Sequence, residues 1–410
     1  MRLKREASTA SFIPTYALAN LGAHVGFMPL VILLLPRRVE ALAPLGKVAL
    51  LSWLLLIGAV VASIAHIIAG HASDRWLARH GRRRGLIAIG LAALVSAYFL
   101  LAFAQTLPGL VVAVVIFQAA LNLMFAPLGA LLADHVADAK KGMAAGLLNF
   151  ALPLSGLVVT LLGLWSVRDG ALPFIIVAAL IALLVAPLLL AWPRDLPLLS
   201  AQHGATDRQG PQSADLMRNF ALALVARLLI QLGAAVILSY LYFYVENKVG
   251  TASHYTLGSA SDGVARLSLV ATLASLAAGI AGGHLSDRIG RRRIPLMFAA
   301  LVCAASLAAL ATLDDWRAIV FAYAAFVAAL TAFLSIHSAM VAQMLGNEPR
   351  RGALLGLMNL ANTLPSVAAP ALTLAYGGLM LSSRLFEALL LTTTGAAAIA
   401  AVLIAMVRVR

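Results

Sequence analysis

The sequence predicts an all-α membrane protein with twelve transmembrane helices in two six-helix halves. Three observations support this fold class: the composition, the spacing of the apolar runs, and a short charged motif that occurs twice. Of the 410 residues, 62% are hydrophobic and only 11% are charged, and the mean hydropathy is +0.96. Soluble domains have about 45–50% apolar and about 25% charged residues, so this composition is typical of a chain that lies largely in lipid.

Twelve apolar runs are long enough to cross a bilayer, whose hydrocarbon core requires about 20 helical residues. All five tryptophans lie at or just beyond the end of a run, where lipid headgroups accommodate the indole ring. The segment 105–109 is the only separation between the third and fourth runs, but one helix across both would be too long for the membrane. In chain order the runs cover residues 12–35, 50–70, 85–105, 108–132, 143–166, 171–192, 219–245, 264–286, 294–313, 317–345, 352–378 and 383–407.

Positive charges indicate the orientation. With the N-terminus in the cytoplasm, 21 of the 30 Lys and Arg residues lie on the cytoplasmic side and eight lie outside. The positive-inside rule therefore places both termini in the cytoplasm. The basic first six residues precede a long run that has no small-residue cleavage site, so the first span is expected to remain in the protein.

The longest polar segment divides the chain. Residues 193–218 are rich in Gly, Pro, Ser, Gln and charges, which predicts a cytoplasmic linker between an N-terminal bundle at 1–192 and a C-terminal bundle at 219–410. The two halves are also related in sequence. GLLNFALP, which begins at Gly146, is similar to GLMNLANTLP, which begins at Gly356, so Asn149 is equivalent to Asn359.

A charged motif occurs at equivalent places in the two halves. GHASDRWLARHGRRR covers residues 70–84 and GHLSDRIGRRR covers residues 283–293. Each is expected to form a tight cytoplasmic turn, with its arginines near lipid headgroups and the carbonyl end of a helix. Either the turn only sets topology, or Asp74 and Asp287 form interhelical ion pairs that break when the cytoplasmic side opens. We favour the second interpretation, with Asp134 as the partner of the arginines at 82–84.

Twelve spans in six plus six, with this motif after the eighth span, resemble the major facilitator superfamily of secondary transporters. The resemblance implies alternating access, a working monomer and a gating role for the motif. The first copy, with its D-R-x-x-x-R-x-G-R-R-R spacing, resembles sucrose-type proton symporters and glycoside cation symporters. The antiporter patterns R-x-x-Q-G and G-x-x-x-G-P-x-x-G-G are absent. With Asp134 added as the expected partner, the predicted gating residues are Gly70, Asp74, Arg75, Gly81, Arg82, Asp134, Gly283, Asp287, Arg288, Gly290 and Arg291.

Polar side chains inside a bilayer are costly and are therefore candidates for function. Arg227 is the single charge deep in a span, and Gln231 lies one turn further on the same face. Arg227 either extends to the membrane interface or binds an anionic or hydrogen-bonding group of a substrate. We expect a substrate site near the midplane between the two halves. Its predicted contacts are Asn20, His24, Gln118, Asn122, Arg227, Gln231 and Asn359.

Three residues are candidates for carrying a coupled proton. His24 and His337 are either hydrogen-bonded to neighbouring helices or titratable during transport. Glu387, about one turn into the last span, is the acid nearest to the middle of a span. Because acids are so scarce within the spans, a cationic substrate is disfavoured. Asn149 and Asn359 are equally compatible with simple interhelical hydrogen bonds.

The motifs of enzymes are missing. There is no phosphate-binding Gly loop, no H-E-x-x-H, no G-x-S-x-G and only one cysteine, Cys303, so no enzyme activity, cofactor or metal is expected. The basic residues lie in short turns, which argues against a nucleic-acid partner. We expect a multi-pass protein of a bacterial cytoplasmic (inner) membrane that moves a small polar or anionic organic solute by proton-coupled symport. Proton-coupled efflux of drugs or metabolites and a non-transporting receptor or assembly protein are the alternatives.

Overall fold

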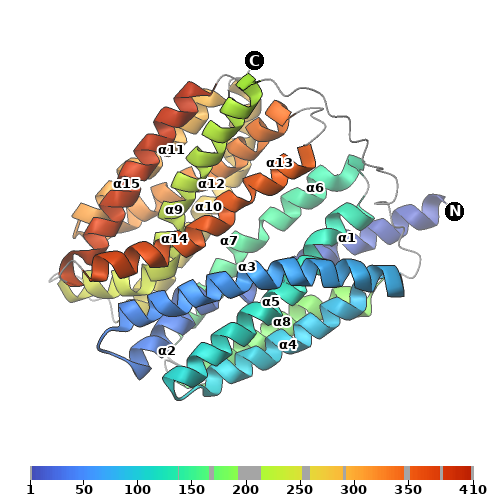
Figure 1. The fold of residues 1–410 in the computed structure, drawn as a ribbon, viewed down its shortest axis with the longest axis horizontal. Coiled ribbons are helices and arrows are strands. Elements are labelled where there is room, and N and C mark those ends of the chain that lie inside the picture. Colours follow the sequence, from blue (N-terminus) through green and yellow to red (C-terminus); the bar gives the residue numbers. More distant parts are fainter. Residues whose placement is uncertain are drawn as a thin grey trace. The chain divides into compact units, whose positions relative to one another are not determined.

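The computed structural model describes residues 2–136, 138–165, 170–192, 214–251, 259–289, 292–345, 351–378 and 382–407, and the elements in these ranges are helices (Figure 1). The helices form two compact units, residues 1–204 and 205–410. The all-α fold class is therefore confirmed.

The first unit begins with three helical segments that follow one another closely. They are α1 (Arg2–Val25), a π-helical turn (Leu30–Leu34) and α2 (Leu35–Leu42). The others are α3 (Lys47–His80), α4 (Arg84–Phe103), α5 (Leu107–His135), α6 (Asp138–Asn149), α7 (Ala151–Leu164) and α8 (Leu172–Leu190).

The second unit has the same order of long helices. They are α9 (Ala214–Thr251), α10 (Ala260–Ile289), α11 (Arg293–Thr312), α12 (Trp316–Leu345), α13 (Arg351–Met358), α14 (Leu360–Gly377) and α15 (Ser382–Met406). Most of the predicted linker, residues 193–213, lies outside the described residues, and α9 begins at Ala214, before the expected start of the C-terminal bundle.

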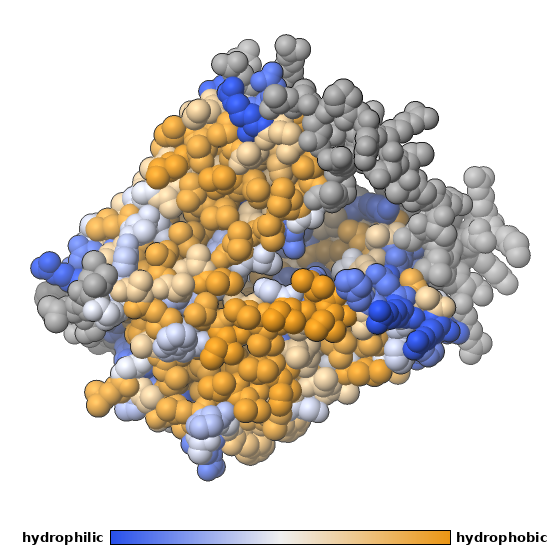
Figure 2. Space-filling view, in the orientation of Figure 1, coloured by the Kyte–Doolittle hydropathy of each residue, from blue (hydrophilic) through white to orange (hydrophobic). Residues whose placement is uncertain are grey.

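Eleven described segments are long and apolar enough to cross a membrane. The remaining predicted span, residues 352–378, is present as two consecutive helices, α13 and α14, so all twelve predicted spans have a helical counterpart. Hydrophobic residues cover much of the helix surface in Figure 2, and large apolar side chains such as Phe321 and Leu183 are exposed. Lipid contact accounts for this exposure, which would be unfavourable in water.

The two units repeat one packing pattern. In the first, α5 packs on α3 and α4, and α8 packs on α1 and α4. In the second, α12 packs on α10 and α11, and α15 packs on α9 and α11. Aromatic side chains fill the interior of each unit, including Tyr98 and Phe117 in the first and Phe326 and Phe333 in the second. The internal sequence repeat thus corresponds to a repeat in structure.

Both copies of the duplicated Asn motif interrupt a helix. α6 ends at Asn149 and α7 begins two residues later, and Asn359 separates α13 from α14 in the same way. Pro153 explains the first interruption, because a proline lacks the N–H that would bond the carbonyl four residues earlier and its ring crowds that carbonyl. In the second copy Pro365 follows the interruption at a greater distance.

The charged motif of the first half is mostly helical, which corrects the predicted turn at residues 70–84. α3 continues through this region to His80, because one internal glycine, Gly70, lowers helix stability without ending a helix. Gly81 ends α3 with a left-handed φ of 71°, and its N–H bonds the carbonyl oxygen of Leu77 at 2.8 Å. Only residues 81–83 form the turn.

The motif of the second half is described only in part. Gly283, Asp287 and Arg288 lie within α10, although their side chains are outside the described part of the structure. Gly290 and Arg291 lie outside the described residues altogether.

Candidate functional site

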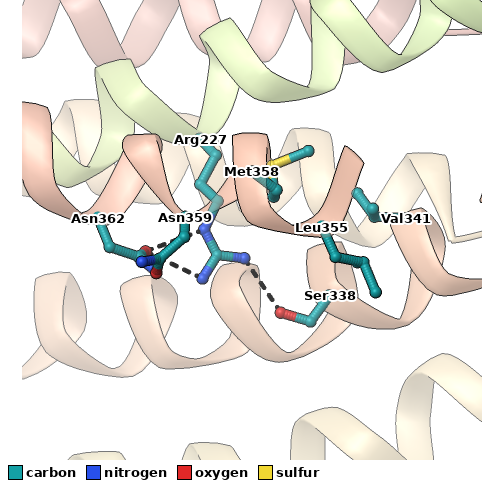
Figure 3. Close-up of a pocket in the computed structure, with 7 residues that line it drawn as sticks. All are labelled: Arg227, Ser338, Val341, Leu355, Met358, Asn359 and Asn362. Atoms are coloured by element: carbon teal, nitrogen blue, oxygen red, sulfur yellow. Dashed lines mark hydrogen bonds between the residues drawn. The ribbon is translucent and has the colours of Figure 1, made fainter. Parts of the chain in front are cut away.

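A polar cluster in the second unit surrounds Arg227. Arg227 and Gln231 lie one turn apart on α9, so their side chains leave the same face of the helix. The guanidinium of Arg227 is partly buried and extends toward α12 and the junction of α13 and α14 (Figure 3). This geometry brings together residues that are more than a hundred positions apart in the chain.

The guanidinium donates to two neighbouring helices. Its Nη1 bonds the hydroxyl oxygen of Ser338 on α12 at 3.1 Å and lies 3.5 Å from Nδ1 of His337. Its Nε and Nη2 both bond Oδ1 of Asn362 on α14, at 3.3 and 3.2 Å. All of these partners are neutral groups. Among the described side chains, no carboxylate pairs with Arg227.

Asn362 is the acceptor at the centre of the cluster. Its Oδ1 also accepts a hydrogen bond from Nε2 of Gln231 at 3.0 Å. Its own amide nitrogen donates to Oδ1 of Asn359 at 2.9 Å. Arg227, Gln231 and Asn359, which the sequence singled out, are therefore joined through a residue that was not among the predicted contacts.

A small cavity lies beside the cluster, with a volume of about 170 Å³. Arg227, Asn359 and Asn362 lie along one side of it in Figure 3, and Val341 and Leu355 lie along the other. Ser338 and Met358 complete the lining. Because pockets for drug-sized ligands have volumes of about 300–1,000 Å³, this cavity suits a small solute or part of one.

His337 is buried between the cluster and α9. Its Nε2 lies 3.0 Å from the carbonyl oxygen of Ala223, which can only accept, so Nε2 carries a proton. Its Nδ1 faces the guanidinium of Arg227, which can only donate. These two contacts match the neutral imidazole with a lone pair on Nδ1. Phe333 stacks on the ring, with 5.4 Å between centroids, and holds it in place.

In the first unit, Asn20 and His24 lie one turn apart on α1. The amide nitrogen of Asn20 donates to the carbonyl oxygen of Leu148 on α6 at 3.1 Å. Nδ1 of His24 donates to the carbonyl oxygen of Asn20 at 2.8 Å, and the edge of the ring meets Phe125 on α5. Nε2 of His24 has no hydrogen-bond partner among the described residues, so it can accept a proton without breaking a contact.

Gln118 and Asn122 lie on α5 facing α3. The amide nitrogen of Asn122 donates to the carbonyl oxygen of Gln118 at 2.9 Å, which leaves Oδ1 of Asn122 to accept from Nδ1 of His66 at 3.1 Å. Gln118 packs where α3 has Gly58, since a Cβ built there would lie 3.1 Å from Nε2 of Gln118. The four polar residues predicted in this unit thus form two separate pairs.

A buried ion cluster joins the turn after α3 to the end of α5. Nε of Arg83 bonds Asp134 at 2.6 Å, Nη2 bonds Asp74 at 2.9 Å, and Nη1 donates to Ser73. Arg83 is 4% exposed and Asp134 is 3% exposed. Burial alone lowers the pKa of the Arg83 guanidinium, but the hydrogen bonds and charges of the two carboxylates outweigh it and raise that pKa.

The other predicted gating and proton-carrying residues lie outside these clusters. Arg75 and Arg82 are exposed, and a Cβ at Gly70 would meet no atom within 4 Å, so no close approach requires glycine there. Glu387 is exposed on α15 and has no hydrogen bond or ion pair among the described side chains.

Three residues that the sequence did not select belong to these clusters, and a fourth, Arg83, was predicted only as one of the arginines at 82–84 that would pair with Asp134. Asn362 and Ser338 contact Arg227, His66 contacts Asn122, and Arg83 holds the two aspartates. The position of Asn362 one turn after Asn359 was a usable signal, because residues three apart lie on one helix face. Nothing in the sequence distinguishes Arg83 from the arginines on either side of it.

Comparison with known proteins identifies the family. The family model described as Major Facilitator Superfamily matches residues 7–261 and 252–410. No match is found among curated proteins. The chain belongs to the major facilitator superfamily and folds like its solved transporters, as the following structures show.

One similar structure is a bacterial homolog of the human lysosomal transporter Spinster in an inward-facing and occupied conformation. It is 13% identical over 98% of this chain and 96% of that chain, with a TM-score of 0.66. Another is the nucleoside transporter NupG, which is 13% identical over 98% of this chain and 100% of that chain, with a TM-score of 0.72. With the family match over nearly its whole length, this chain is a multi-pass secondary transporter of the major facilitator superfamily.

Proposed function

We propose that this transporter moves a small polar or anionic organic solute across the cytoplasmic membrane of a bacterium by proton-coupled symport. The observation that carries the proposal is the set of partners around Arg227. A partly buried guanidinium that bonds only amide, hydroxyl and imidazole groups among the described residues retains an unneutralised charge. A substrate carboxylate or a strongly accepting polar group would supply the missing partner.

The same charge argues against cationic drugs as the main substrate. A cation brought next to Arg227 would lose hydration without gaining an opposite charge, which is unfavourable in a low-dielectric site. The proposed contacts in the second unit are Arg227, Gln231 and Asn359. We propose Asn20, His24, Gln118 and Asn122 of the first unit as further substrate contacts, since their amide and imidazole groups can donate and accept hydrogen bonds.

We propose His24 as the residue that carries the coupled proton. Its Nδ1 keeps the hydrogen bond to the carbonyl oxygen of Asn20 in either protonation state, while Nε2 gains or loses the proton. A second proton on His337 would instead point at the guanidinium of Arg227. The geometry therefore favours His24 over His337.

We propose that Arg83, Asp74 and Asp134 form a latch that holds α3, the following turn and α5 together in one transport state. Buried ion pairs with good geometry suit a two-state element, because separating the partners exposes or strands a charge. The positive-inside count supports placing this latch and both termini in the cytoplasm. The family resemblance supports a working monomer.

The proposal is tested first by thermal-shift measurements on the purified protein in detergent. The solutes are organic acids, sugars, peptides, nucleosides and lipophilic cations, each at two pH values, since a ligand that prefers the folded state raises its melting temperature. Nucleosides are included because NupG, a structural neighbour, is a nucleoside transporter. We expect polar or anionic solutes to stabilise the protein and Arg227→Ala to abolish the shift. Arg384→Ala, an exposed arginine on α15, is the control.

Flux into proteoliposomes then tests transport and coupling. Uptake of the stabilising solute should follow an imposed pH gradient and should collapse when a protonophore removes it. Stabilisation by lipophilic cations alone would replace the proposal with drug efflux. Ligand binding without any flux would instead favour the receptor alternative.

A further inference from the structure

Three N–H groups converge on one neutral oxygen at the centre of the polar cluster. Oδ1 of Asn362 accepts from Nε and Nη2 of Arg227 and from Nε2 of Gln231, at 3.3, 3.2 and 3.0 Å. An amide oxygen has two lone pairs, so three donors exceed its ordinary capacity. The two bonds from Arg227 are also longer than the usual 2.9–3.0 Å or so for N–H···O.

The orientation of the Asn362 amide follows from its neighbours. Its nitrogen donates to Oδ1 of Asn359 at 2.9 Å, and a reversed amide would direct its N–H groups at the guanidinium. The oxygen therefore faces Arg227. It lies at the Nε/Nη2 edge of the guanidinium, which is one of the edges that bind a carboxylate through two parallel hydrogen bonds.

We propose that Oδ1 of Asn362 occupies the position at which a substrate carboxylate binds, and that the substrate binds by displacing it. This inference rests on the proposed function and narrows its substrate class to carboxylate-bearing solutes. A carboxylate supplies two oxygens and a full negative charge to the same donors, and charge-assisted hydrogen bonds are about twice as strong as neutral ones. The cavity of about 170 Å³ beside the cluster provides space for the incoming group.

The displacement would act on a helix junction. Asn362 is in the first turn of α14, and its backbone N–H bonds the carbonyl oxygen of Asn359, the residue that separates α13 from α14. Its side chain bonds the same residue. When a carboxylate replaces Asn362 at Arg227, one contact that fixes the junction to α9 is lost. Occupancy of the site is thereby linked to the position of the α13–α14 junction.

Asn362→Asp tests, without any ligand, whether a carboxylate is favourable at the position of Asn362 Oδ1. Aspartate has the same shape as asparagine and carries a carboxylate. We expect this variant to melt several degrees higher than the wild type, since an anion at this place neutralises Arg227. The gain should vanish in the double variant Asn362→Asp/Arg227→Ala. Thr363→Ala changes the adjacent exposed residue, whose hydroxyl bonds only the carbonyl oxygen of Leu360 among the described residues, and serves as the matched control.

The displacement is tested by competition between an added carboxylate and the side chain at position 362. The probes are sodium acetate and sodium benzoate, and sodium chloride at equal ionic strength is the control. We expect the Asn362→Asp variant to lose the thermal shift that acetate or benzoate gives the wild type. Removing the competing oxygen in Asn362→Ala should lower the apparent Kd for these probes by roughly 5- to 10-fold, because one net hydrogen bond of about 1 kcal/mol no longer opposes binding. Acetamide, the neutral analogue of acetate, should give no shift.

The outcomes separate this inference from the proposed function. If carboxylates bind and depend on Arg227, but Asn362→Asp neither raises the melting temperature nor blocks them, the displacement is wrong and the proposed function stands. If Asn362→Asp stabilises through Arg227 but neither carboxylate binds the wild type or Asn362→Ala, the displacement by a carboxylate is wrong. In that case the thermal-shift screen tests the proposed function separately. The proposed function stands if a neutral polar solute binds, and it fails if none does.

Discussion

Arg38 and Lys248, which lie 210 residues apart, make equivalent contacts within their own halves. Arg38 on α2 donates from Nε to the carbonyl oxygen of Ala104, just after α4, at 3.0 Å. Lys248 on α9 donates from Nζ to the carbonyl oxygen of Leu313, just after α11, at 2.9 Å. Each cation therefore lies at the carbonyl end of a helix, where the helix dipole favours positive charge.

The contacts of Arg38 and Lys248 with these helix ends are expected to contribute differently to stability. Arg38 also reaches the carbonyl oxygen of Ala102 at 3.2 Å, and its side chain engages two carbonyl groups at once. Lys248 adds an ion pair with Asp314, whose side chain is 76% exposed, and exposed pairs contribute little. We expect Arg38→Ala to cost about 1–3 kcal/mol and Lys248→Ala about 0.5–1.5 kcal/mol. Melting temperatures in detergent measure both, and equal losses would contradict the ranking.

The Arg83 cluster predicts a large loss from one conservative change. Asp134→Asn leaves the buried guanidinium with the more exposed Asp74 as its only charged partner in the cluster. Stranding a buried charge costs about 3–5 kcal/mol, so the melting temperature should fall strongly. Asp74→Asn should cost less than about 1 kcal/mol, because the Asp74 side chain is 74% exposed and solvent screens the pair.

Arg82→Ala is the matched control for this cluster, since Arg82 precedes Arg83 and is exposed. We expect its effect on stability to be within about 0.5 kcal/mol. A loss at Arg82 as large as that for Asp134→Asn would show that the bulk charge of the turn matters, rather than the buried pair. A latch further predicts that Asp134→Asn changes the accessibility of cysteines introduced on the cytoplasmic side.

The fold could be predicted because bilayer physics acts on local sequence. Each span must satisfy its own backbone and present apolar side chains, so length and hydropathy alone located twelve of them. Helix ends were harder to predict. α3 continues ten residues past Gly70 and ends at His80, because the charged residues between them are compatible with a helix and only Gly81 adopts the left-handed conformation that ends it.

The polar cluster could be predicted only along single helices. Arg227 and Gln231 share a face of α9, and spacing revealed that relation. Their joint contact with Asn362 depends on how α9 packs against α14, and no local pattern encodes that packing. The same limit applies to the contact between His66 on α3 and Asn122 on α5. Contacts between side chains of different helices can be predicted only when the packing of those helices is known.

Substitutions of the two histidine candidates should have opposite effects on the coupling of uptake to a pH gradient. His24→Gln removes the proposed proton carrier, so uptake driven by a pH gradient should fall at least tenfold, while exchange of solute without a gradient should persist. His337→Gln keeps a donor for the carbonyl oxygen of Ala223 and an acceptor for Arg227, so coupling should remain. Uptake by proteoliposomes that contain equal amounts of each variant measures both effects. Loss of coupling only in His337→Gln would reverse the assignment.

Two glycines in the first unit predict changes of opposite sign. Gly90 on α4 lies against α5 so closely that a Cβ would be 2.8 Å from the backbone nitrogen of Met124 and 2.9 Å from its Cα. Backbone atoms cannot relieve a clash by a change of rotamer, so Gly90→Ala must move α4 and α5 apart and weaken the contacts between them. We expect it to cost about 1–3 kcal/mol, the usual range for overpacking.

Gly129 on α5 is the matched control for Gly90, since a Cβ there would meet no atom within 4 Å. Alanine has less conformational freedom to lose than glycine, so Gly129→Ala should stabilise the helix by about 0.5–1 kcal/mol. The two melting temperatures should therefore move in opposite directions from that of the wild type. A fall in both would mean that the α4–α5 contact does not set the difference, and that glycine is required along α5 for another reason.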